Sequence, residues 1–123
     1  MPAKKTEYEE ISQAIFNAIN NLKLKEKTLI IASSDMTHYE TQESTKNKDS
    51  LAIEAILKLD ENLLMERVEE YNMSMCGDAP VAIAIMTAKK LGAKKAKLIK
   101  YQTSGDTTGD YQAVVGYAGI IIS

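Results

Sequence analysis

Three short segments of the 123-residue chain combine residue types that could perform chemistry. The first, residues 33–39, follows an apolar run and contains Asp35 and His38, three positions apart. A carboxylate beside an imidazole can orient a ring nitrogen, or the two side chains can bind one metal ion. The structural alternative is that Asp35 caps a short helical turn and His38 is a surface histidine. On residue types alone, this alternative is the more frequent one.

The second segment, residues 73–80, contains the only cysteine of the chain, Cys76, just before a helix that is expected to begin at Asp78. The partial positive charge of a helix N-terminus favours a thiolate, which can be a metal ligand or a nucleophile. Free cysteines are also among the most frequently buried residues. Both interpretations of Cys76 stay open at this point.

The third segment, residues 104–110, is rich in glycine and aspartate and includes Ser104 and Asp106. Gly-Asp pairs favour tight turns, so a loop is the default expectation. The segment lacks the Lys-Ser/Thr pair and the following helix of a phosphate-binding loop, and it lacks the ligand spacing of a calcium loop. It could form the wall of a pocket but offers no ligand set of its own.

The elements that must position these segments follow from the apolar pattern. It predicts helices over residues 6–22, 49–57, 60–71 and 78–91, strands over 28–33, 96–103 and 113–122, and a polar loop over 34–48. The order is α-β-α-α-α-β-β, which indicates an α/β fold. A strand, a helical crossover and another strand favour a mostly parallel sheet, although the last two strands could also pair as neighbours.

Bulk properties fit a single α/β domain over residues 1–123. The formal net charge of −2 gives no reason to expect a nucleic-acid or membrane partner, and no apolar run is long enough to span a bilayer. One cysteine and the absence of an N-terminal apolar leader predict a cytoplasmic protein.

Taken together, the three segments are more specific than any one of them. Their order and spacing resemble the Memo-like protein family, and the resemblance covers nearly the whole chain but only the C-terminal half or so of the family's usual length. The residues that carry it are Ser33-Ser34-Asp35-x-x-His38-Tyr39, Cys76-Gly77-x-x-Pro80, Thr103-Ser104-Gly105-Asp106-x-x-Gly109-Asp110 and Val114-Val115-Gly116-Tyr117-Ala118.

The resemblance implies half of a fold related to the class III non-haem iron extradiol dioxygenases. It also implies iron or copper binding and redox chemistry, phosphopeptide recognition in animals, and a radical-SAM partner protein in prokaryotes. By the same resemblance, Cys76 is a metal ligand, His38 is an acid–base group or ligand, and Asp35 is its neighbour. The remaining pocket wall would consist of Ser34, Gly77, Ser104 and Asp106.

The family's other metal-binding histidines belong to an N-terminal half, whereas His38 is the only histidine of this chain. One chain therefore cannot form a two-histidine, one-carboxylate iron site. Three hypotheses follow: a metal-dependent oxidoreductase half-site, a module that binds a peptide or anion at Ser33, Ser34, Ser104 and the Asp78 helix start, or a structural domain that dimerises. Exposed apolar surface is expected where another half would pack, which favours a homo-oligomer or a separate N-terminal partner.

Overall fold

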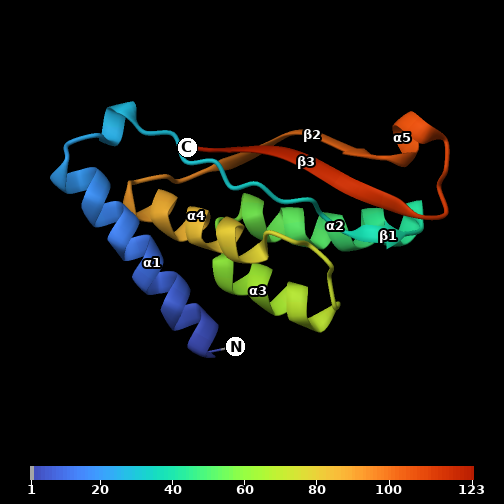
Figure 1. Ribbon diagram of the computed structural model, residues 1–123, viewed down its shortest axis with the longest axis horizontal. Helices are drawn as coiled ribbons and strands as arrows, with labels where there is room; N and C mark the ends of the chain where they lie inside the picture. The colour runs from blue at the N-terminus through green and yellow to red at the C-terminus, as the bar shows by residue number, and fades with distance from the viewer. Residues whose placement is uncertain (1) are drawn as a thin grey trace.

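The computed structural model describes residues 2–123 and the side chains of residues 4–123. Five α-helices, a short 3-10 helix and three strands occur in the described residues (Figure 1). In chain order they are α1 (Pro2–Asn21), η1 (Lys25–Lys27), β1 (His38–Glu40), α2 (Gln42–Leu57), α3 (Glu61–Glu70), α4 (Asp78–Lys90), β2 (Ala96–Thr103), α5 (Gly105–Thr108) and β3 (Val114–Ile122).

The three strands form a sheet of order β1-β3-β2 in which both pairings are antiparallel. The ladder between β2 and β3 runs from Thr103 opposite Gly116 to Ala96 opposite Ile122. The prediction of a mostly parallel sheet with helical crossovers is therefore wrong. The connection between β2 and β3 holds only the single-turn helix α5, and a parallel pairing needs a much longer crossover.

The strand predicted over residues 28–33 is also absent, because this stretch is extended but pairs with no strand. Backbone pairing with β3 begins only at Met36, whose N–H donates to the Gly116 carbonyl over 2.9 Å, and at Thr37, whose carbonyl accepts from the Gly116 N–H. The three-residue strand β1 follows at His38, with a register shift between His38 and Glu40. The apolar run marks an extended segment correctly, but an apolar run cannot show whether a partner strand is available.

The helix predictions are closer to the structure. α4 begins at Asp78 as expected, and Asp60 caps α3 by accepting from the Leu63 N–H over 2.9 Å. α2 begins at Gln42 rather than near residue 49, because the Thr41 hydroxyl accepts from the Ser44 N–H and caps the polar first turns. The predicted loop over residues 34–48 is thus only partly loop.

The elements are arranged in layers, with the sheet over α2 and with α4 between α1 and α3 (Figure 1). The core lies where the sheet, α2 and α4 meet, and its most buried aliphatic side chains include Ile56, Leu64 and Ile85. Within the described part of the chain, no helix is both long enough and apolar enough to cross a membrane. This packing brings the end of the extended segment, β1 and the start of α4 to one place.

Candidate metal centre

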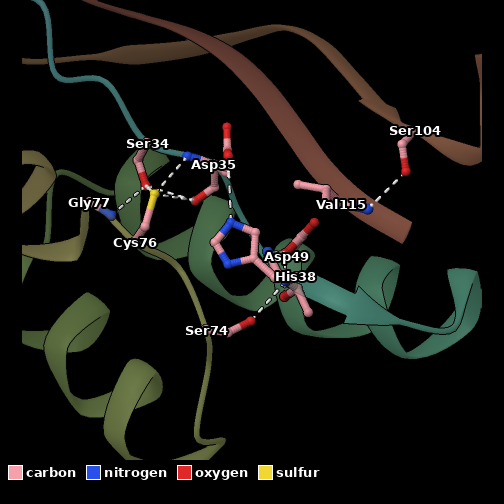
Figure 2. A network of polar contacts seen from close by, with 10 residues as sticks. Ser34, Asp35, His38, Asp49, Ser74, Cys76, Gly77, Ser104 and Val115 are labelled. Carbon is pink, nitrogen blue, oxygen red and sulfur yellow. Dashed lines mark hydrogen bonds and ion pairs between the residues drawn. The ribbon is translucent and has the colours of Figure 1, made fainter. Parts of the chain in front are cut away.

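Asp35, His38 and Cys76 converge at that place, although Cys76 lies 38 residues beyond His38 in the sequence (Figure 2). One candidate ligand atom from each side chain lies within 4.8 Å of the other two. Asp35 ends the extended segment, His38 begins β1, and Cys76 precedes α4 by two residues. The spatial grouping predicted from the sequence is therefore present in the structure.

The acid and the imidazole face each other directly. Asp35 Oδ2 lies 3.5 Å from His38 Nε2. The His38 side chain is 23% exposed and that of Asp35 is 50% exposed, so the ring is partly enclosed while the carboxylate reaches solvent. Asp35 can therefore orient the ring, or both side chains can bind one ion that enters from the solvent.

The Cys76 side chain is held against the segment that carries Asp35. The backbone N–H of Asp35 donates to Sγ over 3.3 Å, and the Ser34 hydroxyl lies 4.0 Å from the same sulfur. The Gly77 N–H donates to Ser34 Oγ over 2.8 Å. Cys76 is exposed, so the alternative of a buried, purely structural cysteine does not apply.

Gly77 itself is buried against the same segment. A β-carbon at this position would lie 2.5 Å from Ser34 Cβ and 2.6 Å from the Ser33 carbonyl oxygen. Only a residue without a side chain lets the two loops approach this closely. Two of the predicted wall residues, Ser34 and Gly77, therefore adjoin the cysteine.

Two further residues fix the position of His38, and neither was singled out from the sequence. The Ser74 hydroxyl accepts from the His38 N–H over 2.8 Å. The buried Asp49 carboxylate accepts from the Thr37 N–H and hydroxyl. Asp49 occupies the same face of α2 as buried Ile53 and Ile56, and an acid on an apolar helix stripe was the available signal.

The second oxygen of Asp49 accepts from the Tyr101 hydroxyl over 2.6 Å. Burial of the phenol, together with its hydrogen bond and proximity to the Asp49 carboxylate, raises the pKa of Tyr101 well above its ordinary value. Asp49 thus joins the loop before His38 to β2, which stiffens one side of the candidate site.

Ser104 and Asp106, the other two predicted wall residues, form hydrogen bonds within the connection between β2 and β3. The Ser104 hydroxyl accepts from the Val115 N–H over 3.0 Å. Figure 2 shows Ser104 well apart from Asp35, His38 and Cys76, which we call the triad. Asp106 Oδ2 accepts from the Thr103 N–H. Both side chains shape the end of the sheet rather than contact the three candidate ligands.

An apolar groove of about 550 Å³ extends from Ser34 between the extended segment, α4 and β3. Its lining includes Ile30, Val81 and Ile120, but none of the three candidate ligands. The triad therefore lies beyond the Ser34 end of this groove.

Comparison with known proteins identifies the family of the chain. The family model for Memo-like proteins matches residues 2–121. The chain belongs to the Memo-like protein family.

Its relatives include archaeal members of the same family. A MEMO1 family protein of Methanocaldococcus jannaschii is 54% identical over 99 residues, which are 80% of this Memo-like chain and 34% of the relative. The protein of that family from Methanopyrus kandleri is 46% identical over 112 residues, or 91% of this chain and 39% of the relative. The one from Ignicoccus hospitalis is 44% identical over 110 residues, or 89% and 38%. The match thus spans little more than a third of each relative.

Proposed function

We propose that this Memo-like chain binds a redox-active transition-metal ion, iron or copper, through Cys76 Sγ, a ring nitrogen of His38 and the Asp35 carboxylate. The observation that carries the proposal is the convergence of the three ligand atoms within 4.8 Å of one another. Thiolate, imidazole and carboxylate form a mixed ligand set that suits first-row transition metals, whereas Ca²⁺ and Mg²⁺ prefer oxygen ligands alone.

The observed spacing fits one ion after a small closure. With metal–ligand bonds of about 2.0–2.3 Å, neighbouring ligand atoms lie about 3–4 Å apart. Asp35 and His38 already have this separation, at 3.5 Å. The half-exposed Asp35 carboxylate can swing toward Cys76 without disturbing buried groups, so the folded chain needs little rearrangement to bind the ion.

Three protein ligands leave coordination positions open. Water could fill them, as could a substrate or a residue from another polypeptide. The part of the relatives that this chain does not match, which the resemblance places on the N-terminal side, is one proposed source of additional ligands. A second subunit is the other. The resemblance also adds a radical-SAM protein as a proposed partner. A reducing, cytoplasmic setting would keep Cys76 as a free thiol that can bind the ion.

A bound iron or copper ion would supply one-electron chemistry and polarisation of a bound oxygen atom. The chain's own contribution is the placement of His38 and Asp35. In a site where His38 is not a ligand, its ring nitrogen can exchange a proton with the solvent-exposed Asp35 at 3.5 Å. The metal-dependent oxidoreductase half-site is accordingly the function that this geometry supports best.

The experiment is a titration of the apo chain with Co²⁺ as a spectroscopic probe, and with Fe²⁺ and Cu⁺ under anaerobic conditions. The wild type should develop a near-ultraviolet thiolate charge-transfer band with Co²⁺. We expect Cys76→Ser to lose that band, and His38→Ala and Asp35→Asn to weaken binding by about 10- to 100-fold. Glu66→Gln, which removes an exposed charge from α3, should bind like the wild type. Equal affinities for all variants would refute the proposal.

The alternative of an anion-binding module has less support. The Gly77 N–H at the start of α4 already donates to Ser34 Oγ, and two carboxylates, Asp35 and Asp78, stand near the same helix end. They would repel a phosphate. Phosphate-induced shifts of the backbone amide resonances around Asp78 would nevertheless favour this alternative over metal binding.

A further inference from the structure

Tyr39, the residue after His38, has an unusual backbone conformation. Its φ is 57°, in the left-handed region, which costs a non-glycine residue free energy. Within the described residues, a positive φ occurs at three other non-glycine positions, Lys23, Leu59 and Asn72. Each of these three follows the last turn of a helix and closes it with backbone hydrogen bonds. Tyr39 lies in strand β1, so helix capping does not account for its conformation.

A β-bulge accompanies this conformation. His38 lies opposite Val115 on β3. Glu40 lies opposite Val114, so Tyr39 is an extra residue of β1. In one common type of bulge, the extra residue is a glycine in the left-handed region. A tyrosine at this position therefore retains strain that a glycine would avoid.

The bulge is not needed to direct the side chains on either side of it. Glu40 points toward α2, where its carboxylate pairs with Lys48 over 2.9 Å, whereas the His38 side chain points toward the triad. Adjacent residues of a regular strand already point to opposite faces, so His38 and Glu40 would do so without a residue between them. What the insertion adds is the side chain of Tyr39.

The Tyr39 ring lies beside the imidazole of His38. The two ring centroids are 6.0 Å apart and the ring planes make an angle of 37°. The bulge allows this contact, because neighbours in a regular strand would point away from each other. Tilted ring pairs at this separation attract each other. Tyr39 is 79% exposed, so packing in the core does not explain why the strained conformation is kept.

The contact acts on a part of His38 that its other contacts leave mobile. The Ser74 hydroxyl accepts from the His38 N–H, which fixes the backbone but not the rotation of the imidazole about the side-chain bonds. Asp35 faces the ring at 3.5 Å, but its half-exposed carboxylate can itself move. An aromatic ring beside the imidazole restricts that rotation.

We propose that Tyr39 is a positioning residue that holds the imidazole of His38 toward Asp35 and Cys76. The strained backbone of Tyr39 is retained because it brings the phenol ring to the imidazole. The effect of Tyr39 on metal affinity rests on the proposed metal binding, whereas its effect on the motion of the imidazole does not.

The first test measures the motion of the imidazole in the metal-free chain. His38 is the only histidine, so NMR relaxation of imidazole ring carbons reports on this side chain alone. The imidazole should be rigid in the wild type and in Tyr39→Phe, which keeps the aromatic contact. It should be mobile in Tyr39→Gly, which accepts the left-handed backbone but lacks the ring. An imidazole that is equally rigid in Tyr39→Gly would overturn the proposal.

The second test measures Co²⁺ affinity and urea unfolding of the same variants. We expect Tyr39→Gly to bind Co²⁺ about 10-fold more weakly than the wild type. Its urea midpoint should be no lower, because glycine relieves the strain, and this separates positioning from a loss of fold. Tyr39→Phe should bind like the wild type. Tyr117→Ala is the control, because Tyr117 is a 45% exposed tyrosine of β3 outside the ring pair.

Two results of the second test would overturn the proposal: wild-type affinity in Tyr39→Gly, or an affinity in Tyr39→Phe as low as that of Tyr39→Gly. A wild-type chain that binds no Co²⁺ would refute the proposed metal binding. The motion of the imidazole in the metal-free variants would then decide the role of Tyr39 by itself.

Discussion

Oδ1 of Asp49 lies 2.9 Å from the backbone nitrogen of Thr37 and 2.6 Å from its hydroxyl oxygen. One buried carboxylate oxygen thus holds the residue immediately before His38. The other oxygen is held by the Tyr101 hydroxyl, so the carboxylate has little freedom. The position of His38 therefore depends on a helix residue that is not among the three candidate ligands.

Gly116 leaves room for this carboxylate. A β-carbon at residue 116 would lie 1.8 Å from Asp49 Oδ2, so we expect Gly116→Ala to displace the carboxylate and lower the free energy of unfolding by about 2 kcal/mol. Gly119→Ala is the control on the same strand, because a β-carbon there meets no atom within 4 Å. Urea unfolding of both variants measures the difference, and equal midpoints would contradict this account of the contact.

Tyr101 should make stability fall at alkaline pH. Burial and the Asp49 carboxylate raise its pKa in the folded chain above the ordinary 10.0, so the folded state retains a proton that the unfolded state releases. This contribution to the free energy of unfolding is complete below pH 10 and is lost progressively as pH rises above it. Stability should therefore decline less steeply above pH 10 in Tyr101→Phe than in the wild type.

Urea midpoints at a series of pH values above and below 10 provide the measurement. Tyr39→Phe is the control, because Tyr39 is largely exposed and should leave the wild-type slope unchanged. Parallel slopes for wild type and Tyr101→Phe would show that the Tyr101 phenol does not contribute to this pH dependence.

Gly77 should control metal affinity without being a ligand. An alanine there would push Ser34 and the Ser33 carbonyl away and so separate Cys76 from Asp35. We expect Gly77→Ala to weaken Co²⁺ binding by at least about 10-fold, as is typical when the support of a metal ligand is disturbed. Circular dichroism checks that the fold is retained, and Gly119→Ala again serves as the control. Unchanged affinity would mean that close approach of the two loops is not required.

The sequence predicted the grouping of Asp35, His38 and Cys76 better than it predicted the sheet. Asp35 and His38 are neighbours in one loop and Cys76 precedes a well-marked helix start, so local signals and family resemblance together placed them correctly. Strand direction is not a local property. An apolar run such as residues 28–33 has the same composition whether it pairs in parallel, pairs antiparallel or remains unpaired, and only the rest of the chain decides among these.

The contributions of Asp49 and Ser74 were missed for a related reason. Each holds the loop around His38 through a contact between residues at least twelve positions apart in the chain. A buried acid on an apolar helix face can be noticed in the sequence, but its partner cannot be named before the helix has been docked. Ser74 offers no such signal, since an exposed serine is among the commonest surface residues.

The hydrogen bond between the His38 N–H and the Ser74 hydroxyl closes a long excursion of the chain, in which α2 and α3 leave the site and return to it. In the folded chain, the docking of both helices places Cys76 beside the other two candidate ligands. We therefore expect the three candidate ligands to come together late during folding. Metal uptake would then show that α2 and α3 have both packed in place. A chain arrested before α3 has packed would present Asp35 and His38 without the sulfur.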